Sequence, residues 1–295
     1  MNNIGVYLRL ALATLSWGAV FHIGKYAVTA MTPLSIGAWR FIIAGIVLLP
    51  IAWMNGAWQR TSLSKNIWPL LAMSAFGVFG FNVALFYGLR TTSSVNGALI
   101  MAFNPALTVV LSALINRERV SARQLLGLLI SMTGVLVVVS HGSWHALTTL
   151  SFSHGDLLVM LASLSWAIYS VIPKRFIHGL DPMQVTVATI IGGAVMMGVL
   201  AAAAMPDFFQ QPSMPVLAAI LFMGLFGSVL AYLCWNQGVQ RIGAARAAIF
   251  INMVPMFAAL IGVLLGQPIT LAQVIGAALV ISGVVLSSIA QIGRK

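Results

Sequence analysis

Arg40 is the residue of this sequence best placed to do chemistry, because it is a cation inside a hydrophobic run. It lies some six residues into that run, which is about 9 Å along a helix that rises about 1.5 Å per residue. A charge at such a depth in a membrane is costly unless it is paired. Its guanidinium can hold a carboxylate or phosphate oxygen through two parallel hydrogen bonds. Two roles stay open: binding or gating an anionic substrate, and capping backbone carbonyls or reaching outer headgroups.

Lys25 and His22 are two further ionisable residues, and they share one face of the first hydrophobic run. Lys25 is expected either to contact substrate or to anchor a helix end at the lipid headgroups, as Lys174 would at an equivalent place later in the chain. Histidine titrates close to physiological pH, so His22 could carry a coupled proton. A packing histidine held by a hydrogen bond is the alternative.

Aromatic and amide side chains form a third group that could line a cavity. The candidates for substrate binding are Trp17, Tyr87, Asn104, Trp166, Trp235 and Asn252. For each aromatic residue the alternative is packing against lipid or a place in an interfacial belt. Asn104 and Asn252 stand close to Pro105 and Pro255, so each could either satisfy backbone groups freed by the proline or contact the ligand.

Several kinds of site have no signature in the sequence. There is no nucleotide-binding loop, no nucleophile with its base and no metal-ligand cluster, and the single Cys234 excludes an intrachain disulfide. We therefore expect neither an enzyme nor a protein that binds a cofactor or metal. The four acidic residues lie on connections between the runs, whereas a site for a cationic drug usually needs a buried counter-charge. Neutral, zwitterionic or anionic substrates are favoured.

The composition indicates that these residues sit in a membrane protein. Of 295 residues, only 15 are Lys or Arg and 4 are Asp or Glu, and 60% are hydrophobic. Soluble domains have about 25% charged residues, against 6% in this chain. Ten runs are long enough for helices of about 20 residues, at 6–28, 34–54, 68–89, 95–115, 123–140, 155–177, 183–205, 214–239, 244–265 and 271–292. The sequence predicts an all-α polytopic membrane protein with ten transmembrane helices.

The basic residues predict the orientation of these helices. With the N-terminus inside, twelve Lys and Arg residues fall on the inner side, and the other three are Lys25, Arg40 and Arg90. By the positive-inside rule, both termini are cytoplasmic. We expect a multi-pass protein of a bacterial inner membrane. Because the cations sit between hydrophobic runs, they do not indicate binding to nucleic acid.

An internal repeat is the most informative feature of the sequence. Leu15-Ser16-Trp17 recurs 149 residues later as Leu164-Ser165-Trp166. Pairs at this offset, or one residue more, are Lys25 and Lys174, Pro33 and Pro182, Gly88 and Gly238, Pro105 and Pro255, Gly127 and Gly276, and Gly134 and Gly283. We expect two five-helix copies, 1–140 and 155–292, joined by an outer connection at 141–154. Because five is odd, the copies are inverted, an arrangement that places a site near the membrane midplane and opens it to alternate sides.

Short motifs support this interpretation. They are Ser16-Trp17-Gly18 with Gly24-Lys25, Trp39-Arg40-Phe41, Arg117-Glu118-Arg119-Val120-Ser121, and Gly134-Val135-Leu136. In order and spacing the chain resembles the EamA family of the drug/metabolite transporter superfamily over nearly its whole length. The resemblance implies a ten-helix carrier, commonly an exporter of amino acids or related metabolites, with a cavity between the repeats. Where the family usually has Glu before the last helix, this chain has Gln267.

The expected function is therefore export of a small polar metabolite, an amino acid or a related zwitterion or anion, by alternating access. A lipid-carrier flippase of similar fold and a drug exporter are the closest alternatives, and a passive channel and a membrane scaffold are more distant ones. The expected partners are a small-molecule substrate and the lipid bilayer. One chain with two repeats suffices to complete the cavity.

Overall fold

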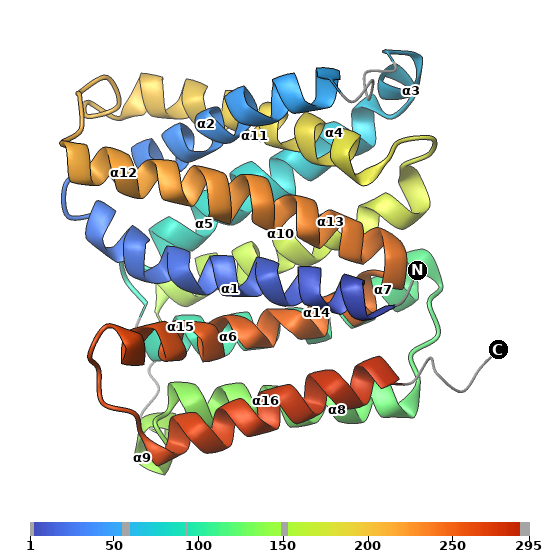
Figure 1. Ribbon diagram of the computed structural model, residues 1–295, viewed down its shortest axis with the longest axis vertical. Helices are drawn as coiled ribbons and strands as arrows, with labels where there is room; N and C mark the ends of the chain where they lie inside the picture. The colour runs from blue at the N-terminus through green and yellow to red at the C-terminus, as the bar shows by residue number, and fades with distance from the viewer. Residues whose placement is uncertain (1–2, 55–59, 93, 149–152, 290–295) are drawn as a thin grey trace.

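Ten apolar helices cross the molecule side by side, alternating in direction (Figure 1). The computed structural model describes residues 3–54, 60–92, 94–148 and 153–289. Residues 149–152 of the expected connection and 290–292 of the expected second copy lie outside them. The first half consists of α1 (Asn3–Ala27), α2 (Pro33–Met54), α3 (Arg60–Lys65), α4 (Ile67–Met73), η1 (Ser74–Gly80), α5 (Phe81–Gly88), α6 (Ser94–Ala102), α7 (Asn104–Asn116), α8 (Ala122–Val139) and α9 (Trp144–Thr148). The second half consists of α10 (His154–Phe176), α11 (Pro182–Ala204), α12 (Met214–Phe222), η2 (Met223–Leu230), α13 (Ala231–Ile242), α14 (Ala244–Ala248), η3 (Ile249–Asn252), α15 (Met253–Leu264) and α16 (Leu271–Ile289).

The two ends of the bundle are distinguished below by the start of α1. We call the end at which α1 begins and α16 ends the N-face, on the right of Figure 1, and the opposite end the far face. Each of the ten spanning segments is apolar and at least 18 residues long, which confirms the predicted all-α fold with ten transmembrane helices in two inverted repeats.

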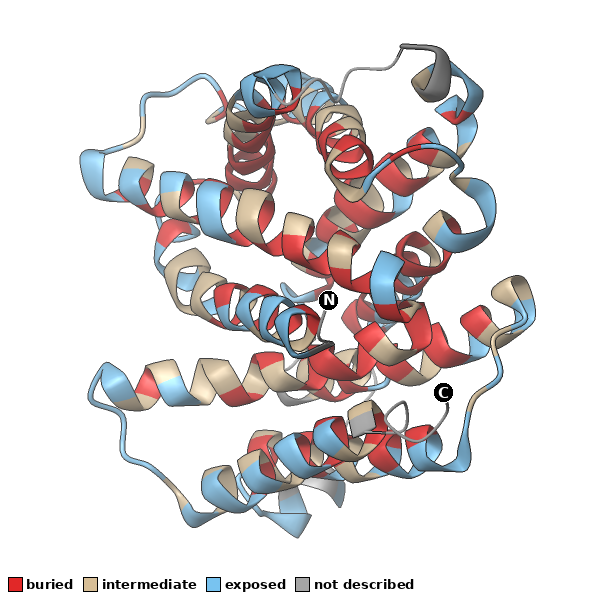
Figure 2. Ribbon diagram, turned by 45° about the vertical axis from the view of Figure 1, so that its right-hand side comes forward, coloured by how far each residue is buried: buried red, intermediate tan, exposed pale blue. Residues whose placement is uncertain are grey.

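Many large apolar side chains face outward from the bundle. Leu8, Ile46, Leu114 and Val199 are each more than 60% exposed, as expected for side chains that contact lipid. Buried positions lie on the helix faces turned toward the middle (Figure 2). The folded chain therefore presents a hydrocarbon-compatible surface around a packed interior.

The first helix of each repeat packs into the other repeat. α1 contacts η2, α13 and α15 of the second half, whereas α10 contacts η1, α5 and α7 of the first half. The two halves are thus interlocked and do not lie side by side as separate bodies. A site between the repeats is consequently built from residues far apart in sequence.

Four of the ten crossings are not the continuous α-helices that the hydrophobic runs suggest. The third and eighth crossings contain π-helical segments, η1 and η2, at equivalent places in the two repeats. A π segment inserts an extra residue into a turn and frees backbone groups to bond elsewhere. The fourth crossing is interrupted at Phe103 and the ninth by the 3₁₀ segment η3, in each case just before a proline. Proline causes this because it has no backbone N–H.

The last helices of the two repeats, α8 and α16, form a close pair. A Cβ on Gly134 would lie 2.7 Å from the Gly276 carbonyl oxygen, and a Cβ on Gly276 would lie 2.7 Å from the Gly134 carbonyl oxygen. A second reciprocal contact joins Gly127 and Gly283. Small residues let helix backbones approach in lipid, so these four glycines fix the pair.

Candidate functional site

Five aromatic side chains meet near the middle of the bundle. This aromatic cluster consists of Trp17 of α1, Trp166 and Tyr169 of α10, and Tyr232 and Trp235 of α13. Ring centroids are 5.2 Å apart for Trp17 and Trp166 and 5.5 Å apart for Trp166 and Trp235. Four members are almost fully buried, and Trp17 is half-buried. The cluster joins helices of both repeats at their interface.

Two polar atoms in the aromatic cluster lack partners. The indole Nε1 atoms of Trp166 and Trp235 are buried and have no hydrogen-bond partner among the residues that the structure describes. By contrast, the Trp17 Nε1 donates to the Gly227 carbonyl oxygen at 3.0 Å. A buried unpaired donor is costly, so the cluster has hydrogen-bonding capacity that a polar ligand can satisfy.

Arg40 is anchored on the π segment η2 beside this cluster. Its Nε donates to Ser228 Oγ at 2.7 Å and its Nη2 donates to the Gly227 carbonyl oxygen at 3.1 Å. Its guanidinium carbon also lies 4.8 Å from the centre of the Phe41 ring. The Gly227 carbonyl thus accepts from both Arg40 and Trp17, and part of the role of Arg40 is to satisfy backbone that the π segment frees.

The two repeats differ in the surroundings of the equivalent glycines of their π segments. Gly227 corresponds to Gly77 of η1, whose carbonyl oxygen accepts from the Tyr232 hydroxyl at 3.2 Å. A Cβ on Gly227 would lie 2.5 Å from Val20, whereas a Cβ on Gly77 would overlap the bulkier Tyr169. The repeat replaces Arg40 by Thr189 in the second half. Only one of the two equivalent positions therefore contains a cation.

A cavity of about 650 Å³ opens at the N-face between the two repeats. Its wall is formed by the connection between α7 and α8, the end of α10, the start of α11, the end of α13, and α14. Six charged residues line it: Arg117, Glu118, Arg119, Lys174, Arg241 and Arg246. Five of the six are cations.

Asn236 lies at the inner end of this cavity and connects it to the aromatic cluster. Its Nδ2 lies 2.8 Å from the Tyr169 hydroxyl and donates to Thr186 Oγ1 at 2.9 Å. Asn236 is buried, follows Trp235 in the chain and contacts Tyr169, so the inner end of the cavity adjoins the cluster. Arg40 adjoins the same cluster through Phe41, because the Phe41 ring centroid lies 5.8 Å from that of Tyr232. Arg40 itself does not line the cavity.

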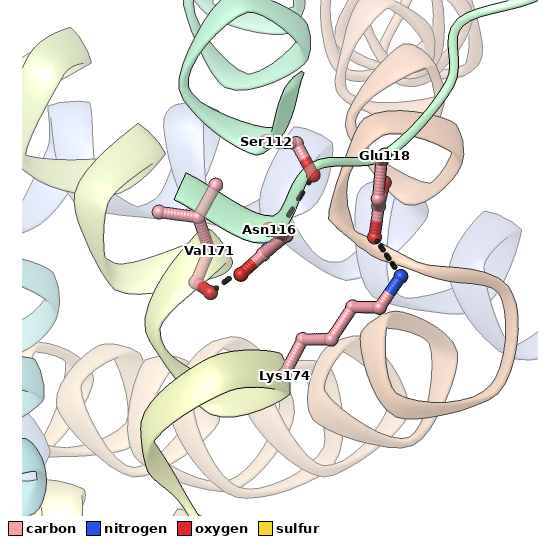
Figure 3. A network of polar contacts seen from close by, with 5 residues as sticks. All are labelled: Ser112, Asn116, Glu118, Val171 and Lys174. Carbon is pink, nitrogen blue, oxygen red and sulfur yellow. Dashed lines mark hydrogen bonds and ion pairs between the residues drawn. The ribbon is translucent and has the colours of Figure 1, made fainter. Parts of the chain in front are cut away.

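An ion pair bridges the two repeats at the cavity mouth (Figure 3). Lys174 Nζ lies 2.8 Å from Glu118 Oε1, which joins the end of α10 to the connection between α7 and α8. Beside it, Asn116 Nδ2 donates to the Val171 carbonyl oxygen at 3.1 Å. Because Lys174 is half-exposed, the pair adds little stability, but it neutralises the cavity's only carboxylate.

Carboxylates tie helices together on the far face. Asp207 accepts from the backbone N–H of Thr32, and Oδ1 accepts from the hydroxyls of Thr32 and Ser35 at 2.9 and 3.0 Å. Burial favours the neutral acid, but these hydrogen bonds outweigh it, so the pKa of Asp207 is below its ordinary value. Asp156 accepts in the same way from Thr92 and Asn96. Both carboxylates hold the far-face ends of neighbouring helices.

The sequence candidates fall into two groups in the structure. Trp17, Trp166 and Trp235 meet in the aromatic cluster, and Arg40 lies beside it. The others lie apart: Lys25 is exposed, the exposed Tyr87 lies under Arg90, His22 bonds the Ala258 carbonyl, Asn104 bonds Ser163 and Asn252 bonds Ser131. The Oδ1 atoms of Asn104 and Asn252 are buried without a partner in the described chain.

Sequence reasoning missed Tyr232 and the charged wall of the cavity. The arginines of the wall were interpreted as topology signals alone, because hydropathy does not distinguish a loop that faces lipid from one that faces a cavity. The available signal was their position: Arg117 and Arg119 follow the fourth run, and Arg241 and Arg246 lie before and at the start of the ninth, so all four fall at the same end of the bundle.

Comparison with known proteins gives consistent matches over the whole chain. The profile of the EamA-like transporter family matches residues 4–140 and 153–289. The uncharacterized transporter YyaM of Bacillus subtilis (strain 168) is 39% identical over 289 residues, covering 98% of this chain and 95% of that protein. An uncharacterized transporter of Archaeoglobus fulgidus is 28% identical over 281 residues, covering 94% of this chain and 96% of that protein. One crystal structure of another protein superposes with a TM-score of 0.82 at 20% identity, covering 98% of each chain, which shows the shared fold.

Proposed function

The chain belongs to the EamA-like transporter family, and from this premise we propose that it exports a small polar metabolite across a bacterial inner membrane by alternating access. One observation carries the proposal: a cavity of about 650 Å³ lies between the repeats, opens at the N-face and ends at Asn236, which adjoins the aromatic cluster. A volume in this range suits a small metabolite. The substrate enters from the N-face, which is the cytoplasmic side.

The two repeats provide a way to exchange access. The π segments η1 and η2 stand at equivalent places, and the carbonyls of Gly77 and Gly227 each accept a bond from a side chain of another helix. Inverted repeats give two packings of similar energy, one open to each side. In the inward-open packing the aromatic cluster separates the cavity from Arg40. The opposite packing opens the cluster and brings the substrate past Arg40 toward the far face.

The substrate class follows from the polar groups along this route. The unpartnered indole N–H groups of Trp166 and Trp235 donate to oxygen atoms of the substrate, and Arg40 receives a carboxylate or similar group beyond them. Amino acids and related zwitterions or anions offer both kinds of acceptor. No buried carboxylate lines the cavity or contacts the aromatic cluster in the described chain, so permanently cationic drugs are disfavoured.

Metabolite efflux from cells tests the proposal. We compare wild type, an empty vector, Gln240→Trp and Gln210→Trp by mass spectrometry of medium and cytosol. Gln240 is exposed in the cavity wall, whereas Gln210 is exposed on the far-face connection between α11 and α12. The same change at each position places an indole inside the cavity in one protein and outside it in the other.

We expect one class of polar metabolite to accumulate outside wild-type and Gln210→Trp cells and not outside Gln240→Trp cells, at equal amounts of protein in the membrane. Equal efflux from the two variants would show that the cavity is not the route. If wild-type and empty-vector cells release the same metabolites but differ in the distribution of lipid headgroups, a lipid-carrier flippase would be favoured instead.

A further inference from the structure

No carboxylate of the described residues forms an ion pair with an arginine of the cavity wall. The sequence has only four acidic residues. Glu118 pairs with Lys174, Asp156 accepts from Thr92, Asp181 accepts from the Gln184 N–H, and Asp207 accepts from Thr32. Among the described residues, the one ion pair of the cavity wall is that of Lys174 with Glu118, so Arg117, Arg119, Arg241 and Arg246 form no ion pair there. Asp181 caps α11 next to the wall residues Leu180 and Pro182, and the four arginines outnumber it.

Arg246 differs from the usual basic residues of a membrane boundary. Such residues are explained by the positive-inside rule when they point toward headgroups. Arg246 lies in α14 and is half-buried, and the residues directly before and after it in the chain are buried. Its side chain lines the cavity. It forms no ion pair with any of the described residues. A cation in a concave, partly enclosed wall attracts anions more strongly than one on an open surface, because the low-dielectric protein focuses its field.

We propose that the N-face cavity is a binding site for a small organic anion, whose carboxylate or phosphate group is held by Arg246 with Arg241 and the arginines at 117 and 119. This inference deepens the proposed function by giving the substrate a net negative charge as it enters. Glu118 does not repel the anion, because Lys174 neutralises it. The neutral Asn236 at the inner end of the cavity, which is hydrogen-bonded to Tyr169 and Thr186, receives the uncharged part of the molecule.

The potential inside the cavity can be measured without knowing the substrate. Cys234 is the only cysteine, so Cys234→Ala gives a background without thiols. Ile177→Cys then places one thiol in the half-buried lining of the cavity. On protein purified in detergent, the rates of modification by the anionic sulfonatoethyl and the cationic trimethylammonioethyl methanethiosulfonate are compared, each divided by its rate with free cysteine.

We expect the anionic reagent to react faster than the cationic one, by about fivefold or more after this correction. Arg246→Gln lowers the ratio of the anionic rate to the cationic rate by about twofold to fivefold, because it removes one nearby charge. Arg246→Lys keeps that charge and therefore keeps the ratio. The matched control is Arg123→Gln, which removes an exposed cation of α8 that does not line the cavity. If Arg246→Gln does not fold, the exposed Arg241→Gln tests the same expectation. A ratio near one, or an equal fall in Arg123→Gln, overturns the proposal.

Binding itself is measured with a neutral thiol reagent. Citrate and inorganic phosphate are the probe anions, and choline chloride at equal ionic strength is the control. We expect the anions to slow modification of the Ile177→Cys thiol by about twofold or more, and to lose this effect in Arg246→Gln. Equal rates in anion and choline overturn the binding site. A positive thiol result without any metabolite efflux would refute the transport proposal and leave the anion site standing.

Discussion

Arg40 shows how one side chain can be both structural and functional. Its Nη2 donates to the Gly227 carbonyl, as in the alternative in which it caps backbone carbonyls, and its Nε donates to the Ser228 hydroxyl. Those bonds hold the guanidinium in place without neutralising its charge, since both acceptors are uncharged. A fixed, unneutralised cation next to the aromatic cluster is suited to receive an anionic group.

We predict that Arg40→Gln and Ser228→Ala separate the two roles. Each loses a buried hydrogen-bond partner, so each should destabilise the protein by about 1–3 kcal/mol. Only Arg40→Gln also removes the charge, so it alone should lower efflux strongly at equal membrane expression. Thermal unfolding in detergent and the efflux assay measure the two effects. If efflux in both variants simply follows their stability, Arg40 has no role beyond holding η2.

At the scale of elements, the ten spans follow from hydrophobic runs, but their internal breaks do not. The run at 68–89 predicted one helix, and the structure divides it into α4, η1 and α5. Hydropathy reports only whether a residue is apolar, and Ser74–Gly80 is as apolar in a π segment as in an α-helix. The prolines at 105 and 255 did signal the other breaks, because a missing N–H is visible in the sequence.

The candidate site was predictable to the extent that the repeat pairs its residues. Trp17 and Trp166, which the repeat pairs, were candidates to line a cavity, and the structure places them in edge-to-face contact. Tyr232 has no such signal, because its repeat counterpart is the small polar Asn82. Lys25 and Lys174 are equivalent in the sequence, but Lys25 lies exposed at the end of α1, whereas Lys174 pairs with Glu118 at the cavity mouth.

The pair of α8 and α16 carries a prediction about elements. In Gly134→Val, the new side chain would overlap the Gly276 carbonyl and Val280, so the two helices must separate. We expect a loss of about 1–3 kcal/mol or more from overpacking, seen as a lower unfolding temperature in detergent. Gly5→Val is the matched control, because a Cβ at Gly5 meets nothing within 4 Å and Gly5 also lies in a helix. Equal losses in the two variants would show that the close approach of α8 and α16 does not matter for stability.

At the scale of the whole molecule, the distribution of cations and the opening of the cavity both favour the N-face as the side where the substrate enters. The cations gather at the N-face, and the cavity of about 650 Å³ opens there, between repeats that interlock through α1 and α10. On the far face the carboxylates Asp156 and Asp207 tie the helix ends together. A membrane potential that is negative inside opposes the exit of a cation and favours the exit of an anion. An anion taken up at a cytoplasmic N-face would therefore be driven outward without a coupled ion.

This asymmetry predicts the sidedness of the protein. In the Cys234→Ala background, a thiol at Gln210→Cys lies on the far face and one at Gln240→Cys in the N-face cavity, and both positions are exposed. With a membrane-impermeant maleimide on spheroplasts, we expect Gln210→Cys to be labelled at once and Gln240→Cys only after permeabilisation. The reason is that the positive-inside rule, with twelve of fifteen cations on that side, predicts a cytoplasmic N-face. The reverse pattern would place the cavity outside and turn the proposed exporter into an importer. Labelling of both thiols in intact spheroplasts would instead indicate a continuous pore.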